Sequence, residues 1–424
     1  MISISRSLGR DLRAAIRKLG TSRSATPPPI ELMAGRGGLT IRSSGTDVSV
    51  SVHIPGRFPE ARLLVPAAAL ADCESRDDQP IAFRAGRSGR IAVDWTEAGQ
   101  PRNREYPTPA SALPFPKPPI RFAPTSGELL QALDAAGRAT AQDSASRYVL
   151  NGIQLRGSGE IVATDSKQLL LQGGFSFPWT GDVLVPRSDL FAILASIATG
   201  SVSVARTPTH VWIERGAWTV SLRIQEGTFP DARTLVARVK EAGTELVLDP
   251  VDRDLLLHQL PGLPGQKDDH RPVTLDLGNR AVVRAKGEAD GRPVEVVLTR
   301  SDVTGKPVRA ACDRTFLIAA LKLGFTRIAI ASSDRPIVCR DGARTYLFMS
   351  LTDDVIVPHA RSAASKLTTT PRGPGRRVGL PALPVVTKPS LKPRPRPVPA
   401  TRAEPGMFRS LIGRIGGLFG SGRR

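Results

Sequence analysis

Short segments in which apolar and polar residues alternate recur along the chain, as expected for strands with one buried face. In DVSVSVHI, the apolar residues Val48, Val50, Val52 and Ile54 share one side. The segments TELVLD, PVTLDLG, PVEVVLT and TRIAIAS follow the same pattern, and turn residues separate them at short intervals. The pattern predicts several short antiparallel strands.

Helical spacing appears between these segments. Near the N-terminus, Leu8, Leu12, Ile16 and Leu19 recur with the period of a helix. The same region is rich in Arg and Ser and poor in acidic residues, which is also typical of a transit peptide. We favour a short strand leading into a helix, because a similar arrangement returns twice further along the chain.

The sequence contains three copies of one pattern. Similar helix starts lie about 120 residues apart, at Ser7, at Thr125 with a capping box to Glu128, and at Asp249 followed by Pro250. Second helices are expected near Pro66, Pro186 and Cys312. A Thr-Asp pair also recurs, at Thr46-Asp47 and at Thr164-Asp165.

Each copy therefore has the order strand, helix, strands, helix, strands. This order indicates an α+β fold in which each domain has an antiparallel sheet with two helices on one face. We expect three tandem domains, at residues 1–117, 118–244 and 245–352. The remaining segment, 353–424, is rich in proline and basic residues and is expected to be a disordered or polyproline tail.

The basic character of the chain indicates an anionic partner. Its 424 residues have a formal net charge of +20, and the tail contributes 14 Lys and Arg against 3 Asp and Glu. Nucleic acid and a membrane surface both fit this charge. The last residues, GMFRSLIGRIGGLFGSGRR, form a short basic amphipathic segment. No apolar run approaches the length of a membrane span.

Enzymatic and metal-binding patterns are weak. Cys73, Cys312 and Cys339 are far apart and form no metal-binding motif, which fits a reducing cytoplasm. The segment GLPGQKDD lacks the ending of a phosphate-binding loop. The nearby His258, Asp268, Asp269 and His270 are better explained by a solvated loop than by a metal site. We expect no catalysis, no cofactor and no metal, although a nucleic-acid enzyme with an unrecognised site is a weaker alternative.

Four stretches carry a resemblance to a known family. They are RYVLNGIQL (147–155), EIVATDSKQLLL (160–171), VLVPRSDL (183–190) and EGTFPDARTLV (226–236). With three repeats in this order, the chain resembles the bacterial DNA polymerase sliding clamp, the beta subunit of DNA polymerase III. The resemblance implies sliding-clamp domains in a head-to-tail ring dimer that encircles double-stranded DNA. It also implies DNA polymerase III, a clamp loader and other clamp-binding-motif proteins as partners, in the cytoplasm at the replisome.

Encirclement requires sparse contacts from the helices to DNA phosphates. The expected DNA-facing residues are Arg10, Arg13, Arg17, Lys18, Arg138, Arg253, Arg314 and Lys322. For each of them, a solvated helix face is an equal alternative.

The resemblance also implies a cleft that binds short apolar peptide motifs of partner proteins. The matching positions are Leu150, Thr164, Asp165, Ser166, Lys167, Gln168, Leu169, Pro230, Thr234, Leu235, Leu347, Phe348, Met349 and Leu351. For Leu150 and Leu169, ordinary core positions are the alternative.

The chain departs from the family in several places. Ser166, Lys167 and Gln168 replace a Gly-His-Arg type of sequence, and Thr234 replaces a basic residue. The tail and the basic core are also unusual. They leave open a specialised second clamp, or a clamp-like scaffold that binds DNA or membrane through its tail. A further hypothesis is that the terminal GGLFG docks into the chain's own cleft and competes with partners.

Overall fold

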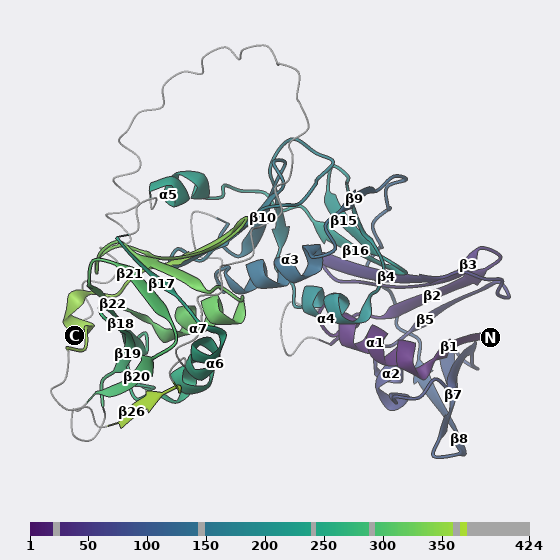
Figure 1. Cartoon of the computed structure of the whole chain (residues 1–424). Helices are drawn as coiled ribbons and strands as arrows, with labels where there is room; N and C mark the ends of the chain where they lie inside the picture. The colour runs from purple at the N-terminus through teal and green to yellow at the C-terminus, as the bar shows by residue number, and fades with distance from the viewer. Residues whose placement is uncertain (20–25, 143–148, 239–242, 288–292, 359–364, 371–424) are drawn as a thin grey trace, which may run out of the picture. The chain divides into compact units, whose positions relative to one another are not determined.

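One order of elements occurs three times in the computed structural model. Each repeat runs strand, helix, three-stranded meander, single strand, helix, three-stranded meander, beginning at β1 (Ile2–Ser5), β9 (Ala123–Thr125) and β17 (Thr244–Val247). The third repeat has one further strand, β21 (Asp302–Gly305), between its first meander and its single strand. The structure describes residues 1–19, 26–142, 149–238, 243–287, 293–358 and 365–370, which belong to the unit Met1–Thr370 (Figure 1). The order of elements predicted from the sequence is confirmed.

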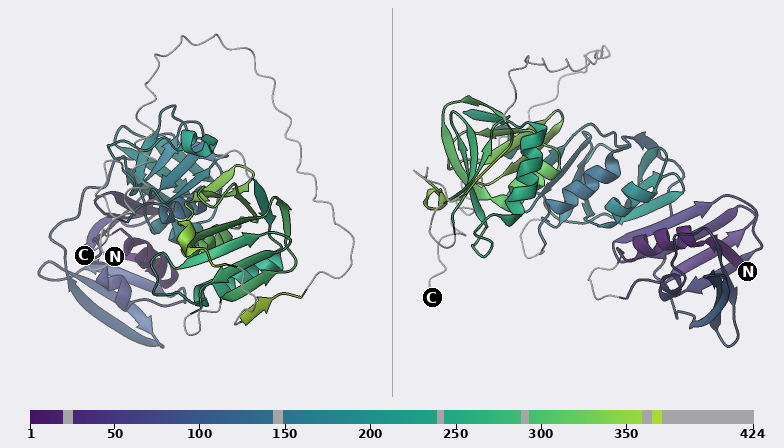
Figure 2. Two further views of the ribbon diagram at one scale, coloured as in Figure 1. Left: turned by 90° about the vertical axis from the view of Figure 1, so that its left-hand side faces the viewer. Right: turned by 60° about the horizontal axis from the view of Figure 1, so that its bottom comes forward.

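Helices occupy equivalent places in the three repeats. They are α1 (Arg6–Ile16) and α2 (Ala68–Asp72), α3 (Leu129–Arg138) and α4 (Leu190–Ile197), and α6 (Pro250–Gln259) and α7 (Arg314–Lys322). One further helix, α5 (Ala232–Arg238), precedes the third repeat, and short 3₁₀ turns lie at Leu260–Gly262 and Asp353–Val355. In Figure 2 the helices of the first two repeats lie side by side, and α1 contacts both α2 and α4.

Local capping explains where the helices start. The Asp249 side chain accepts a hydrogen bond from the backbone N–H of Val251, as predicted from the Asp-Pro sequence. Ser5, rather than Ser7, caps α1. The expected capping box between Thr125 and Glu128 is absent from α3, because Thr125 belongs to β9 and the helix begins at Leu129.

The strands form four sheets, and each is described from one edge strand to the other. Sheet A contains β1, β6 (Pro80–Ala85), β7 (Arg90–Glu97) and β8 (Gln100–Pro107). Sheet B contains β5 (Ala61–Val65), β2 (Ile30–Gly35), β3 (Gly38–Ser44), β4 (Val48–Ile54), β16 (Trp218–Arg223), β15 (His210–Arg215), β14 (Val202–Arg206) and β9.

Sheet C contains β13 (Val183–Pro186), β10 (Gly152–Arg156), β11 (Glu160–Thr164), β12 (Gln168–Gln172), β25 (Arg344–Phe348), β24 (Ile337–Asp341), β23 (Arg327–Ile330), β17 and β21 (Asp302–Gly305). Sheet D contains β22 (Val308–Asp313), β18 (Pro272–Leu277), β19 (Ala281–Ala285), β20 (Val294–Leu298) and β26 (Ser365–Thr368).

Sheets B and C each combine strands from two consecutive repeats, which differs from the single sheet per domain expected from the sequence. In sheet B, β4 of the first repeat pairs antiparallel with β16 of the second. In sheet C, β12 of the second repeat pairs antiparallel with β25 of the third. In both junctions, the last strand of one repeat's first meander meets the last strand of the next repeat's second meander. We call this contact the repeat junction.

The folded part continues past the third repeat into the segment expected to be tail. β26 pairs in parallel with β20, and the backbone N–H of Val357 donates to the Thr274 hydroxyl. Residues 371–424, including the amphipathic segment and GGLFG, lie outside the described residues. Within the described residues, no helix is long and apolar enough to cross a membrane.

Candidate functional site

The polar break between β11 and β12 is a tight turn held by its own side chains. The Asp165 carboxylate accepts hydrogen bonds from the backbone N–H groups of Lys167 and Gln168, at 2.8 and 2.9 Å. Thr164 Oγ1 donates to the carbonyl of Gln168 at 2.6 Å and accepts from the N–H of Ser166. Ser166 has a φ of +79°, so the chain reverses there in a left-handed conformation. The Thr-Asp pair thus shapes the turn.

The turn is also fixed to the third repeat. Gln168 and Leu169 of β12 lie opposite Phe348 and Leu347 of β25. The hydroxyl of Tyr346 donates to Gln168 Oε1 at 2.5 Å, and the Gln168 amide in turn donates to Asp165. Both bonds are short and sheltered, so the turn and the repeat junction support one another.

A small apolar cluster lies beside this junction, separate from the main core. Its buried members are Val162, Leu169, Ala232, Val338 and Leu347, and its partly buried members include Leu171, Phe229, Leu235 and Val236. The residues come from β11, β12, β24, β25 and α5 with its preceding loop. We call this set the junction cluster. Its half-buried side chains present apolar surface next to a polar turn.

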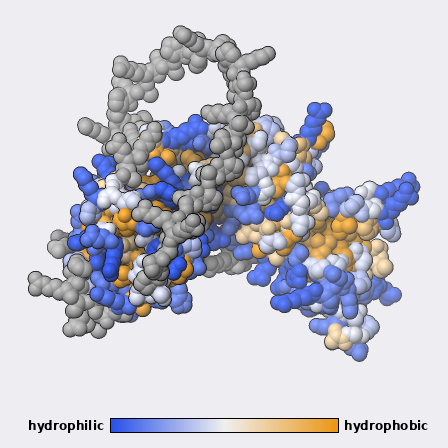
Figure 3. Space-filling view, in the orientation of Figure 1, coloured by the Kyte–Doolittle hydropathy of each residue, from blue (hydrophilic) through white to orange (hydrophobic). Residues whose placement is uncertain are grey.

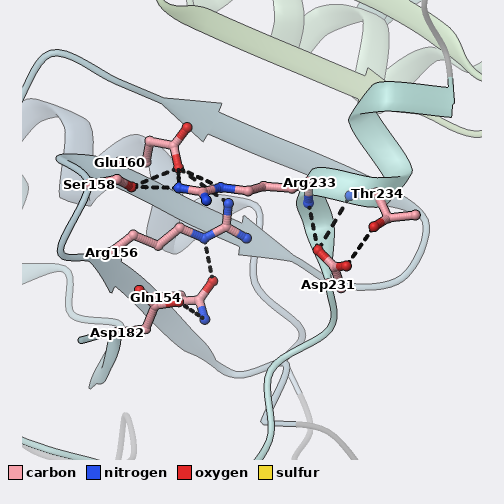
Figure 4. A network of polar contacts seen from close by, with 8 residues as sticks. All are labelled: Gln154, Arg156, Ser158, Glu160, Asp182, Asp231, Arg233 and Thr234. Carbon is pink, nitrogen blue, oxygen red and sulfur yellow. Dashed lines mark hydrogen bonds and ion pairs between the residues drawn. The ribbon is translucent and has the colours of Figure 1, made fainter. Parts of the chain in front are cut away.

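The N-terminus of α5 is anchored by polar contacts (Figure 4). Asp231 accepts from the backbone N–H of Arg233 and from the hydroxyl of Thr234, at 3.1 and 2.6 Å. The Arg233 guanidinium reaches Glu160 at 2.8 Å, and Arg156 also pairs with Glu160. These bonds attach α5 to β10, β11 and their connecting turn.

Electrostatics favours the charged form of this anchor. Although burial raises the pKa of Glu160, hydrogen bonds from Arg233, Ser158 and Arg156 lower it overall. The hydrogen bond from Thr234 is the main cause of the lowered pKa of Asp231. Both carboxylates therefore remain ionised at neutral pH, and α5 remains tethered to sheet C.

The structure brings together most of the predicted cleft residues. Turn residues 164–169 lie beside β25, and Leu235 and Leu347 belong to the junction cluster. Pro230 precedes α5 and Thr234 lies in its first turn, and both are half-buried, as are Met349 and Leu351. Leu150 is buried outside this cluster. Leu169 is almost fully buried, which supports its alternative role as a core residue.

The prediction that Phe348 lines the cleft is wrong. Side chains alternate along a strand, so Phe348 points away from the face that carries Leu347. It is 0% exposed and packs in the main core, with Phe316 and Tyr346 as ring neighbours. A partner cannot reach it from the junction cluster.

Most of the predicted DNA-facing cations are already paired with carboxylates. Arg10 pairs with Asp11, Arg13 with Glu74, Lys18 with Asp189, Arg138 with Asp134, and Arg253 with Asp254. Arg17 and Lys322 are exposed. Hydrophilic side chains dominate the surface over α1 in Figure 3. The helices therefore offer polar surfaces of mixed charge.

The prediction that Arg314 faces DNA is also wrong, because Arg314 is a structural residue. Its side chain is buried, with the residue 1% exposed, and it donates to the carbonyls of Arg271 and Leu263 at 2.8 and 2.6 Å. It also reaches the carbonyls of Leu260 and Pro264. Arg314 therefore organises the loop that contains GLPGQKDD, and it is not available to DNA.

The helix α5 and its salt bridge from Arg233 to Glu160 are not predicted from the sequence. An Asp that follows Pro and precedes several good helix formers is a helix N-terminus signal, and Pro230-Asp231-Ala232 carries it.

Among the described residues, no group of three or more His, Cys, Asp or Glu side chains could hold a metal ion. The three cysteines are unpaired thiols and buried.

Comparisons with known proteins identify the fold. No protein-family model and no curated protein matches the sequence. A DNA polymerase beta subunit from Streptococcus pyogenes is 18% identical, with a TM-score of 0.67, over 82% of this chain and 99% of that chain. A DNA polymerase III subunit beta from Borrelia burgdorferi is 13% identical, with a TM-score of 0.67, over 83% and 99%.

A third similar structure is a sliding clamp, DNA polymerase III subunit beta, from Pseudomonas aeruginosa bound to griselimycin. It is 19% identical, with a TM-score of 0.67, and the match covers 83% of this chain and 99% of that chain. The chain has the fold of these beta subunits. The resemblance found in the four sequence stretches is confirmed at the level of the fold.

Proposed function

We propose that the chain is a DNA sliding clamp, a non-catalytic subunit that encircles duplex DNA and tethers a DNA polymerase and other replication or repair factors. The three repeats would be its three domains, and two copies would join head to tail. Any polymerase activity would belong to the partner. The likeness to DNA polymerase III beta subunits supports this proposal through the fold.

The repeat junction is the observation that carries the proposal. It joins the first repeat to the second through β4 and β16, and the second to the third through β12 and β25. In the same pattern, two equivalent strands are not paired with another repeat of this chain, namely β20 of the third repeat and β8 of the first. Pairing β20 of one copy with β8 of the next continues the series, and identical head-to-tail contacts generate rings when the rotation closes.

The helices suit a sliding contact. Their basic residues are mostly neutralised by neighbouring carboxylates, so the attraction to each phosphate is weak. Tight binding to many phosphates would make the complex strongly salt-dependent and slow to move. A ring retains DNA by enclosing it, and weak contacts are sufficient.

The junction cluster is the proposed partner site. A peptide with apolar anchor residues would contact Leu235 and Leu347, while its backbone would meet the polar turn at Lys167. Such a short linear motif gains affinity from a few buried anchors. The anchor of α5 at Glu160 and Arg233 keeps one wall of this site in place.

The dependence of protein retention on DNA topology tests the function. Dilute chain is mixed with nicked circular plasmid and then concentrated, so that subunits can associate around the duplex. A clamp stays on the circle through a wash at high salt and dissociates after the plasmid is linearised. A scaffold bound through the basic tail would release both forms equally in salt. Equal loss from circular and linear DNA would overturn the proposal.

A further inference from the structure

The β20 edge that the ring requires is already occupied in this chain. β26 pairs in parallel with β20, and Glu295, Val296 and Val297 lie opposite Lys366, Leu367 and Thr368. In the two repeat junctions, the equivalent strands β4 and β12 receive an antiparallel strand from the next repeat. β26 therefore takes the position where β8 of a second copy would pair.

Specific side-chain contacts hold β26 in place. The Thr369 hydroxyl donates to the carboxylate of Asp252, which is 0% exposed, at 2.5 Å. The hydroxyl of Thr299 donates to the carbonyl of Thr369 at 2.9 Å. Leu367 packs against the main core. Because Asp252 lies on α6, these contacts attach the segment both to the sheet and to the helix beneath it.

The strand is also suited to leave. It pairs over four residues, compared with five in each repeat junction, and parallel pairing is slightly less stable per residue than antiparallel pairing. The exposed residues Lys366, Thr368 and Thr370 alternate with the half-buried Leu367 and Thr369. A short strand with one buried face is a reversible cover for a sheet edge.

We propose that Ser365–Thr370 is a built-in competitor of ring closure. It covers β20 in the separate chain and must be displaced before β8 of a second copy can pair there. One strand edge cannot pair with both, so the two states exclude each other. This inference rests on the proposed clamp function, and it adds a control step that depends on a segment following the third repeat.

A disulfide lock provides the direct test in the full-length chain. Val297 and Thr368 are register partners, and neighbouring strands lie within the Cα separation that a disulfide spans. The double variant Val297→Cys/Thr368→Cys can then be compared in its oxidised and reduced forms. The native thiols are all buried and do not compete. Each single-cysteine variant controls for the substitutions.

We expect the oxidised form to remain monomeric in analytical ultracentrifugation and to lose retention on nicked circles, and reduction to restore both. Thr369→Val removes the hydroxyl that contacts Asp252 and should tighten dimerisation by about tenfold. Thr370→Val, at an exposed position just after the same strand, should leave the dimerisation constant unchanged.

The outcomes separate the two proposals. If the oxidised form dimerises as well as the reduced form, β26 is not a competitor, and the clamp function can still hold. If the reduced form and Thr369→Val both stay monomeric and leave nicked circles in high salt, ring closure itself is wrong. Protection of β20 amides in the oxidised form confirms that the lock has formed at the intended edge.

Discussion

Replacing Arg314 tests whether this buried arginine is structural. Arg314→Met keeps a long side chain but removes the guanidinium, so the carbonyls of Arg271 and Leu263 lose their charged donor. Hydrogen bonds to charged groups contribute about 1.5–3 kcal/mol each. Losing these two contacts should therefore cost about 3–6 kcal/mol, a large part of the about 5–15 kcal/mol that stabilises a typical domain.

The assay must report on the third repeat itself. The four tryptophans, Trp95, Trp179, Trp212 and Trp218, all precede that repeat, so their fluorescence is a poor probe of its unfolding. Amide hydrogen exchange across 260–272 and α7 measures the local free energy of opening. Arg314→Met should lower that free energy by about 3–6 kcal/mol and should leave the protection of sheet B unchanged.

Lys322→Ala is the matched control on the same helix, because Lys322 is exposed. It should leave exchange unchanged and, if α7 faces DNA, should weaken salt-sensitive DNA binding. Faster exchange in Lys322→Ala together with unaltered exchange in Arg314→Met would refute the structural role of Arg314. An Arg314→Met chain with unaltered exchange but weaker DNA binding would return Arg314 to the DNA-facing set predicted from the sequence.

Three other predictions concern the candidate partner site. Tyr346→Phe leaves the side-chain oxygen of Gln168, Oε1, without the Tyr346 hydroxyl as its donor. The change should destabilise the repeat junction by about 1–3 kcal/mol, measured by urea unfolding followed by circular dichroism. The lowered pKa of Glu160 means that its tether to α5 is complete above the usual carboxyl pKa and is lost as pH falls through the lowered value. Exchange in α5 should rise only in that acidic range, and Glu160→Gln should raise it at pH 7; a rise near neutral pH in the native chain would contradict this. Leu235→Ser should weaken binding of an apolar clamp-binding peptide by about tenfold, measured by fluorescence anisotropy, while the exposed control Ala237→Ser should not; equal loss in both would remove the junction cluster as the site.

The repeated order of elements could be predicted from sequence because it depends on local signals. Alternation, turn residues and helix caps such as Asp249 lie within a few residues of one another. The Thr164-Asp165 turn is local in the same way, since its hydrogen bonds reach only as far as Gln168.

Features that depend on distant partners could not be predicted. The role of Arg314 follows from carbonyls more than 40 residues away, and an arginine at the start of a helix gives no sign of burial. The resemblance implies Phe348 as a cleft residue, but the alternation of side chains along its strand turns it into the main core. β26 pairs with β20 across about 70 residues, from a region whose composition is otherwise that of a tail.

The repeat junction gives the chain a direction, since β4-type and β16-type strands are not interchangeable. Units joined by such polar contacts can form either closed circles or fibres that grow without limit, depending on small differences in rotation. A bare β20 and a bare β8 would make each molecule a potential link in such a fibre. With β26 in place, an isolated molecule exposes the β8 edge but not the β20 edge, so that molecules cannot add to one another without limit.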